Sequence, residues 1–386
     1  MDAVSNLRKI LLVTNDLGPH TGGIESFILG LLGEMNGNEI VIYTSSQKGD
    51  RDFDQALAKK YGVLVVRDPA KVLLPTPRVN RSVATVMKKY QCEFVWFGAA
   101  APLGWMSGHL RRQGARRIVA LTHGHEVWWS KVWPFSWIMK TMAKQMDEIA
   151  YLGEFTKAAI RAAVGDSVKM HRIAPGISIE HFVPGGKDAG LMSRFNLHNK
   201  LIIVCVGRLV HRKGQDRLIQ AMPEIIRTVP NAHLLVVGKG PRKTYLEKLI
   251  SRKNLADVVT MVGSISYEEL PLYFQLGDVF AMPSRSRFFG LEVEGLGIVY
   301  LEASSSGIPV VAGASGGAPD AVLEGETGLV VDGTDPSAIA AAISSLLLDP
   351  KRRAAMSARG REWAQSEWSW KIWGERFNRL LLGQDS

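Results

Sequence analysis

Short, unbroken runs of apolar residues recur along the chain, and the segments between them carry apolar residues at helical spacing. In the first half the runs cover residues 10–16, 39–45, 62–68, 93–98, 117–124 and 148–153. In the second half they cover residues 201–208, 233–240, 258–264, 279–284, 309–314 and 328–332. Such runs without polar alternation predict strands that are buried on both faces. Helical segments between them predict right-handed crossovers and therefore an α/β fold with two parallel sheets.

The length of 386 residues suits two domains of similar size. A glycine-rich segment at 176–190 precedes the second series of strands, which begins at Leu201. We therefore predict one doubly wound, Rossmann-like domain over residues 1–183 and a second over 184–365. The aromatic, amphipathic segment 366–386 predicts a final helix. From its residues alone this helix belongs either to the second domain or, after crossing back, to the first.

The chain is basic, with a formal net charge of +10. A basic excess favours partners that carry negative charge, such as nucleic acid, anionic lipid or a phosphorylated substrate. The alternative is that the charges only keep the surface hydrated, and charge alone does not decide between the two. Cys92 and Cys205 lie in apolar runs, which predicts small core residues and a reducing, cytoplasmic setting. The opening residues predict a polar lead into a strand rather than a secretory signal. Glycine and proline interrupt the apolar stretch 94–110 too often for a membrane span.

The segment EGLGIVYLEA, residues 294–303, carries the strongest chemical signal. It follows a predicted strand and an Arg/Phe/Gly-rich loop, and it predicts a loop followed by a helix; at helical rise the eight residues from Glu294 to Glu302 would span about 12 Å. Gly295 and Gly297 leave backbone amides open at the helix N-terminus, where a pyrophosphate binds well. Carboxylates on either side of an anion suit hydrogen bonds to sugar hydroxyls. Two glutamates by themselves are more often a solvated helix face, but the glycine spacing and the strand before them favour the binding interpretation here.

A second signal is VGRLVHRKGQD, residues 206–216. Arg208 and Lys213 follow a strand and precede a helix, so two cations are available to neutralise a diphosphate. The alternative is that both side chains face solvent beside Arg212. The strand ends of doubly wound sheets are the usual ligand sites, which favours the first interpretation.

Two weaker signals lie in the first half. Gly22 and Gly23 precede a helix predicted near Ile24, and glycines let a backbone approach a phosphate or a sugar closely. The dinucleotide fingerprint G-x-G-x-x-G is absent after the first strand. His123 and His125 end another predicted strand and share one face of it. They suit a structural hydrogen bond, a sugar contact or a pair of metal ligands. No third ligand follows at a sequence spacing typical of a metal site.

The polar segment DRDFD contains Asp50, Asp52 and Asp54, whose Asp-x-Asp spacing can hold a metal–nucleotide pair. Its position before a predicted helix makes a solvated surface the better interpretation.

In this order the segments resemble glycosyltransferase family 4, which has the GT-B fold of two Rossmann-like domains facing each other across a cleft. The resemblance covers essentially the whole chain. Through THGHEVWW, RLVHRKGQD, VEGLGIVYLEA, SGGAPD and EWSW it is similar to the PimB-type phosphatidylinositol mannoside mannosyltransferases. These enzymes pass mannose from GDP-mannose to a mannosylated phosphatidylinositol. The chain departs from the family pattern at Ser178 and Asp320, and in the bulky loop RSRFFGLEVEG.

The resemblance implies a role for each matching position in the second half. Arg208 and Lys213 would hold the GDP diphosphate. Glu302 would bind the ribose diol and Glu294 the mannose hydroxyls. The remaining implied contacts run through the backbone: phosphate or sugar at Gly297, Ile298 and Val299, and guanine at Ile265.

In the first half the resemblance places the Gly22–Gly23 loop near the donor pyrophosphate and His123 near the transferred sugar. It implies a retaining α-mannosyltransferase that needs no metal or other cofactor, because the cations hold the leaving diphosphate. It also implies that the final helix crosses back to the first domain. Three alternatives stay open: a family 4 enzyme with another nucleotide sugar and acceptor, a sugar-nucleotide epimerase, and a non-catalytic membrane- or nucleic-acid-binding protein.

The segment 127–144 predicts a membrane contact, because aromatic rings and lysines alternate there without an acidic residue. Its members are Trp128, Trp129, Lys131, Trp133, Phe135, Trp137, Lys140 and Lys144. Further cations of the first domain are Arg67, Lys71, Arg78, Arg81, Arg111, Arg112, Arg116 and Arg117. The alternative is that the tryptophans pack a core. The predicted partners are thus a nucleotide-sugar donor, an anionic phospholipid acceptor and the inner face of the cell membrane, and not nucleic acid.

Overall fold

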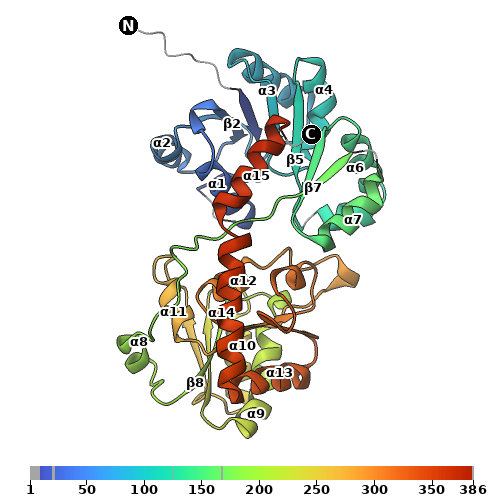
Figure 1. Cartoon of the computed structure of the whole chain (residues 1–386). Helices are drawn as coiled ribbons and strands as arrows, with labels where there is room; N and C mark the ends of the chain where they lie inside the picture. Colours follow the sequence, from blue (N-terminus) through green and yellow to red (C-terminus); the bar gives the residue numbers. More distant parts are fainter. Residues whose placement is uncertain (1–8, 20–21, 125, 167, 385–386) are drawn as a thin grey trace. The chain divides into compact units, whose positions relative to one another are not determined.

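The computed structural model describes residues 9–19, 22–124, 126–166 and 168–384 (Figure 1). The chain divides into two compact units, Met1–Gly176 with Trp370–Ser386, and Ile177–Ser369. The division therefore falls at residue 176, inside the glycine-rich segment in which the sequence pattern suggests a boundary at residue 183. Each unit contains one parallel sheet and is described separately.

Unit 1 contains a seven-stranded parallel sheet in the order β3-β2-β1-β4-β5-β6-β7. Its strands are β1 Ile10–Val13, β2 Ile40–Ser45, β3 Leu64–Asp68, β4 Phe94–Phe97, β5 Arg117–Leu121, β6 Glu148–Tyr151 and β7 Lys169–Arg172. Six of them occupy the predicted apolar runs. The hydrophobic pattern missed β7 because this edge strand, with the sequence KMHR, is only partly buried.

Helices cover both faces of this sheet. They are α1 Gly23–Gly33, α2 Asp50–Tyr61, α3 Pro77–Lys89, α4 Ser107–Arg112, α5 Glu126–Lys131, α6 Phe135–Ala143, α7 Glu154–Val164 and α15 Trp370–Leu382, with short 3-10 turns η1 Gly37–Glu39 and η2 Leu103–Met106. Alternate strand residues face opposite ways, so Leu11 and Val13 join a core with α3, α4, α6 and α7. Ile10 and Leu12 join the other core, with α1, α2 and α15.

The last helix, α15, packs against the sheet of unit 1. Phe377 lies in an edge-to-face contact with Trp96, with ring centroids 4.7 Å apart. The Arg117 side chain donates to the Leu380 carbonyl at 3.0 Å. The sequence alone left the position of this helix open, and these contacts assign it to the first unit.

Unit 2 contains a six-stranded parallel sheet in the order β10-β9-β8-β11-β12-β13. Its strands are β8 Leu201–Val206, β9 Ala232–Val237, β10 Val259–Gly263, β11 Val279–Met282, β12 Val310–Gly313 and β13 Gly328–Val331. Its helices are α8 Ala189–Arg194, α9 Gln215–Thr228, α10 Lys243–Arg252, α11 Leu270–Leu276, α12 Ile298–Ser305, α13 Pro336–Leu348 and α14 Pro350–Glu367, with 3-10 turns η3 His211–Lys213, η4 Phe288–Gly290 and η5 Ala318–Ala321. The predicted α/β fold with two doubly wound parallel sheets is confirmed.

Within the described ranges, no helix is long and apolar enough to cross a bilayer.

Candidate active site

The candidate site of unit 2 lies at the carboxyl edge of its sheet. There β8 has β9 on one side and β11 on the other, so the chain order reverses between β8 and β11. Ligands of doubly wound folds bind outside the strand ends at such a reversal. The loops after β8, β11 and β12 carry most of the residues singled out in the sequence.

Glycine allows these loops to approach one another closely. Gly214 has φ +75°, and a Cβ there would lie 1.8 Å from the Pro283 carbonyl oxygen. Gly316 has φ +55°, and its Cβ would lie 2.2 Å from the Glu294 carbonyl oxygen. A side chain at either position would meet both backbone strain and a backbone clash, so the loops keep this arrangement only with glycine.

Lys213 and Glu294 form a buried ion pair, with Nζ 2.9 Å from Oε2. Lys213 is 9% exposed and Glu294 is 6% exposed. Arg212 Nε adds a third charge 3.8 Å from the same carboxylate oxygen. Burying two charges costs desolvation energy, so an ion pair in this position is weak evidence of a stabilising role and fits a functional one.

The backbone of Glu294 is held by the glycine-rich segment after β12. Its N–H donates to Ser315 Oγ at 3.3 Å, and its carbonyl accepts from the Gly317 N–H at 2.9 Å. The SGGAPD segment thus positions the carboxylate against Lys213.

Glu302 lies inside α12, where burial raises the pKa of its carboxyl group to about 7, against the opposing effect of the Lys213 charge. The predicted order of a loop followed by a helix is confirmed. Gly297, with φ +80°, is the N-cap of α12, which begins at Ile298. Glu294 therefore lies on the preceding loop, and the helical spacing of about 12 Å does not apply to the pair.

The first turn of α12 presents backbone donors to this edge of the sheet. The amides of Ile298 and Val299 occupy the first two helical positions, where no intrahelical acceptor exists. Both residues are half-buried, and Gly297 before them is buried. A helix start of this kind accepts an anion, and here it follows the loop that carries Glu294.

Arg208 lies on the same connection after β8 as Lys213, and Ile265 lies on the loop after β10. Arg208 is exposed on the loop after β8, where its carbonyl accepts from Gln215 Nε2 at 3.2 Å. In the part of the chain that the structure describes, its guanidinium has no carboxylate partner. Ile265 is half-buried just after β10, which ends at Gly263.

The bulky loop before Glu294 turns its aromatic side chains to solvent. Phe288 is mostly exposed and Phe289 is fully exposed, both with positive φ. The bulk noted in the sequence therefore lies outside the protein interior.

A buried charged group centred on Arg285 was not predicted from the sequence pattern. Arg285 Nη2 donates to Asp216 Oδ2 at 2.8 Å and to His211 Nδ1 at 2.7 Å, and its backbone N–H donates to the Arg212 carbonyl at 2.8 Å. Because His211 accepts at Nδ1, its ring is neutral with the proton on Nε2. Burial and the Arg285 charge both lower the pKa of His211.

Although burial alone raises the pKa of Asp216, its hydrogen bond with Arg285 and the Arg285 charge lower it overall. These contacts hold η3, which carries Arg212 and Lys213. The signal was present in the sequence, because Arg285 follows a buried strand, as Arg208 does.

Unit 1 holds the other candidate residues. Gly22 is the N-cap of α1, and its N–H donates to Glu25 Oε2 at 3.1 Å. No described atom lies within 4 Å of the position that a Cβ would occupy on Gly22 or Gly23. The backbone there is accessible, as close approach by a ligand requires.

His123 is buried two residues after β5. Its Nε2 lies 2.8 Å from the Gly98 carbonyl oxygen, and its backbone N–H donates to Glu126 Oε2 at 2.7 Å. Since a carbonyl only accepts, Nε2 carries the proton. His125, the other member of the histidine pair, lies outside the described residues.

The structure thus brings Lys213, Glu294 and the start of α12 together in unit 2 and places Arg208 on the same loop as Lys213. It places Gly22, Gly23 and His123 in unit 1. Among the residues described, no group of three or more His, Cys, Asp or Glu could hold a metal ion. Asp54 instead forms an ion pair with Arg67 at 2.7 Å.

Comparison with known families and proteins matches both units. The glycosyltransferase family 4 model covers residues 21–181, and the model for glycosyl transferases group 1 covers residues 192–363. A GDP-mannose-dependent alpha-(1-6)-phosphatidylinositol monomannoside mannosyltransferase of Mycolicibacterium smegmatis is 44% identical over 97% of this chain and 98% of its own length. The enzyme of the same name from Mycobacterium tuberculosis is 40% identical over 98% of this chain and its own full length.

Solved structures share the fold. Anabaena HepE in complex with UDP superposes with a TM-score of 0.80 at 18% identity, over 97% of this chain and 100% of that chain. A sucrose-phosphate synthase from Thermosynechococcus elongatus gives a TM-score of 0.76 at 23% identity, over 98% of this chain and 99% of that chain.

Two doubly wound units give the GT-B fold, and the two family models matched by these units place the chain in the class of glycosyltransferases. The match to both halves and the full-length similarity make the assignment more specific. The chain belongs to glycosyltransferase family 4.

Proposed function

We propose that this chain is a retaining α-mannosyltransferase that moves mannose from GDP-mannose to a phosphatidylinositol mannoside. The observation that carries the proposal is the buried Lys213–Glu294 pair at the sheet reversal, in a chain 44% identical to an enzyme named for this donor and acceptor. The cation would bind the diphosphate while the carboxylate beside it binds sugar hydroxyls.

The donor would lie along the carboxyl edge of unit 2. Arg208 and Lys213 hold the diphosphate, and the amides at Gly297, Ile298 and Val299 add donors to phosphate or sugar. Glu302 accepts from the ribose diol, and Ile265 contacts guanine through its backbone. From unit 1, the Gly22–Gly23 loop approaches the pyrophosphate and His123 contacts the transferred sugar.

The reaction replaces the bond from the mannose anomeric carbon to the diphosphate by a bond to the acceptor hydroxyl on the same face. The hydroxyl proton goes to the departing diphosphate oxygen. Arg208 and Lys213 stabilise the negative charge that develops on this leaving group, which is the largest catalytic contribution expected. The same cations supply the charge that a metal supplies in other transferases, so no metal is required.

We also propose that the enzyme binds the inner face of the cell membrane peripherally, where the lipid acceptor lies. The aromatic residues of segment 127–144 differ in their exposure. Trp128, Trp129 and Phe135 are half-buried and pack on one another, with centroids 4.8–5.6 Å apart. Trp133 is 81% exposed and Trp137 is 58% exposed, so the interfacial role falls to these two.

A transfer assay tests the function. The purified chain is incubated with GDP-mannose and phosphatidylinositol monomannoside, and the lipid is analysed by mass spectrometry and NMR. The proposal expects a product one hexose heavier with a new α linkage, and little product from UDP-glucose. Absence of that product, or equal transfer from UDP-glucose, would overturn it.

A further inference from the structure

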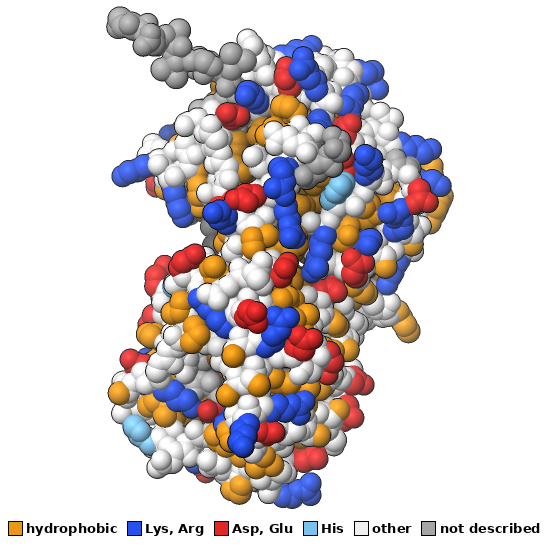
Figure 2. Space-filling view, in the orientation of Figure 1, with side chains coloured by type: hydrophobic (Ala, Val, Ile, Leu, Met, Phe, Trp, Pro, Cys, Tyr) orange, Lys and Arg blue, Asp and Glu red, His pale blue; other side chains and the backbone are white. Residues whose placement is uncertain are grey.

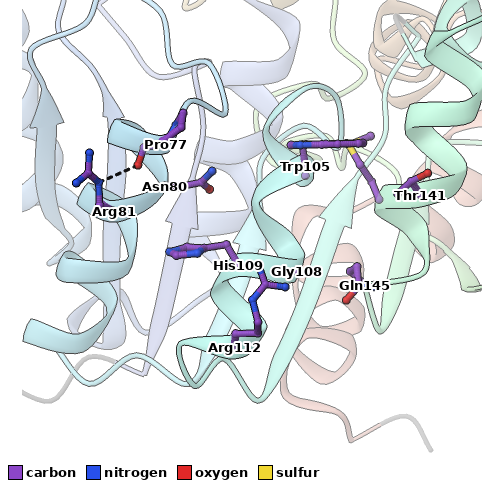
Figure 3. A pocket seen from close by; sticks show the side chains of 11 residues that line it. Pro77, Asn80, Arg81, Trp105, Gly108, His109, Arg112, Thr141 and Gln145 are labelled. Carbon is purple, nitrogen blue, oxygen red and sulfur yellow. Dashed lines mark hydrogen bonds between the residues drawn. The ribbon is translucent and has the colours of Figure 1, made fainter.

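Unit 1 contains a pocket of about 470 Å³ between α3, the η2–α4 segment and α6. Figure 3 shows Trp105, Gly108, His109 and Arg112 along η2 and α4. Asn80 and Arg81 from α3 lie on one side of that segment, and Thr141 and Gln145 from α6 and the turn after it lie on the other. None of the residues assigned to sugar transfer lines this pocket.

Two arginines without a carboxylate partner among the described residues line this pocket. Figure 2 shows basic and acidic side chains interspersed over the visible face, so net charge alone marks no site there. Of the eight first-domain cations noted in the sequence, five form ion pairs: Arg67 with Asp54, Arg78 with Asp68, Arg111 with Asp147, Arg116 with Glu93 and Arg117 with Glu148.

The remaining three are Lys71, Arg81 and Arg112, and both arginines line the pocket. Arg81 Nε donates to the Pro77 carbonyl at 3.3 Å, which leaves its terminal nitrogens available. Among the described residues neither guanidinium has a carboxylate partner, and no Asp or Glu lines the pocket. Two guanidinium groups in an acid-free pocket suit a phosphate group.

The wall of the pocket also carries neutral hydrogen-bonding side chains. Asn80, Thr141 and Gln145 line it together with the two arginines. Amide and hydroxyl groups can donate to and accept from the hydroxyl groups of a ligand. The combination of phosphate and hydroxyl recognition suits a polyol phosphodiester.

The rim of the pocket is aromatic and exposed. Trp105 is 42% exposed, and its ring centroid lies 6.2 Å from that of Trp137. Tryptophans around a cationic pocket suit the headgroup level of a bilayer, where rings insert while the phosphate is bound.

We propose that this pocket binds the phosphodiester headgroup of an anionic phospholipid within the bilayer, as a second lipid site separate from the sugar-transfer site. The proposal rests on the membrane contact proposed above. It assigns to Arg81 and Arg112 the recognition of the phosphate, and to Trp105 and Trp137 the contact with the surrounding interface.

Vesicle co-sedimentation of the full chain tests the pocket. Phosphatidylcholine vesicles with and without phosphatidylinositol are compared for the wild type and for R81Q/R112Q. Each cation near an anionic surface contributes about fivefold to binding, so the double variant is expected to bind phosphatidylinositol vesicles about 30-fold more weakly. Thermal melting confirms that the variant is folded.

The matched control is R51Q/K59Q, which removes two exposed cations from α2. The buried residue of α2, Leu57, belongs to the core on the other face of the sheet. Vesicle binding of this control is expected to change by no more than about twofold. Equal losses of vesicle binding in the two variants would mean that the effect is general electrostatic attraction. That result would refute the pocket as a lipid headgroup site.

A soluble probe separates the pocket from the membrane contact. Glycerophosphoinositol is titrated into both variants and the wild type, and binding is followed by calorimetry. Binding that R81Q/R112Q abolishes, together with absent vesicle binding, would support the pocket and refute the bilayer contact. No effect of R81Q/R112Q in either assay would refute the pocket. Neither assay uses GDP-mannose, so failure of the proposed transfer reaction is recognised separately.

Discussion

At the scale of single residues, the chemistry centres on Lys213 and Glu294, whose charged groups lie 2.9 Å apart in a buried setting. The attraction within a buried ion pair offsets its desolvation free energy only in part, and removal of one partner leaves the other charge uncompensated. Substitution of Lys213 therefore acts on both catalysis and stability. The two effects are separated by measuring turnover and melting on the same variant.

Lys213→Ala is expected to lower kcat/KM by about two orders of magnitude, since a charge-assisted contact to the leaving group contributes about 3 kcal/mol. Glu294→Gln is expected to lower turnover strongly as well. The measurement is GDP release under single-turnover conditions, with Lys248→Ala, an exposed cation on α10, as the charge-matched control. Near-full turnover of Lys213→Ala in a folded protein would refute the diphosphate assignment.

Glu302 makes the stability of the chain depend on pH. Burial raises its pKa from 4.5 to about 7, so the folded state binds the proton more tightly than the unfolded state does. This contribution is complete below pH 4.5 and is lost as pH rises through about 7, a change of roughly 3 kcal/mol. Glu302→Gln should match the wild type near pH 4 and exceed it in stability at pH 8.

Urea unfolding at both pH values measures the difference. An unchanged gap between wild type and Glu302→Gln from pH 4 to pH 8 would contradict the raised pKa. The same substitution removes the carboxylate proposed to bind ribose, so GDP should bind it more weakly.

At the scale of elements, glycine turns position the loop that carries Glu294. The Gly316 Cβ position lies 2.2 Å from the Glu294 carbonyl oxygen, and φ at Gly316 is +55°. A side chain there must displace the loop, and Glu294 would move away from Lys213. Gly325 provides the contrast, because its φ is +77° but no described atom lies within 4 Å of its Cβ position.

Gly316→Ala is thus expected to destabilise the folded state by about 1–2 kcal/mol through backbone strain. In addition, it is expected to lower turnover at least about tenfold. Gly325→Ala should show only the loss of folding stability that backbone strain causes, with turnover close to that of the wild type. Thermal melting and kcat/KM for both variants make the comparison. Similar turnover in the two alanine variants would mean that the glycine segment does not position Glu294.

At the scale of the whole molecule, the apolar runs predicted twelve strands because buried parallel strands need continuous apolar sequence. They missed β7, which is polar and lies at a sheet edge. Lys213 and Glu294 could be predicted because each lies in a segment that follows a buried strand. Arg285 also follows a buried strand but was not singled out. Two further details depend on local backbone and packing that spacing does not encode: α12 begins only after Gly297, which leaves Glu294 on the loop, and Trp128 packs while Trp133 is exposed.

Catalysis is expected to persist in EDTA. The negative charge of the diphosphate is met by Arg208, Lys213 and the N-terminus of α12, so the proposed mechanism needs no divalent ion. Initial rates with and without chelator should agree. Loss of activity that manganese or magnesium restores would point to a metal site at Asp50, Asp52 and Asp54 or at the histidines of residues 123 and 125.

The most direct test of the central claim is the rate of GDP release from GDP-mannose by the purified chain, with and without phosphatidylinositol monomannoside. The lipid is expected to accelerate release by at least about two orders of magnitude, because the acceptor hydroxyl completes the displacement. Lys213→Ala is expected to abolish most of this acceleration. Equal release in the absence of the acceptor, or no release with it, would contradict the assignment as a mannosyltransferase of this lipid.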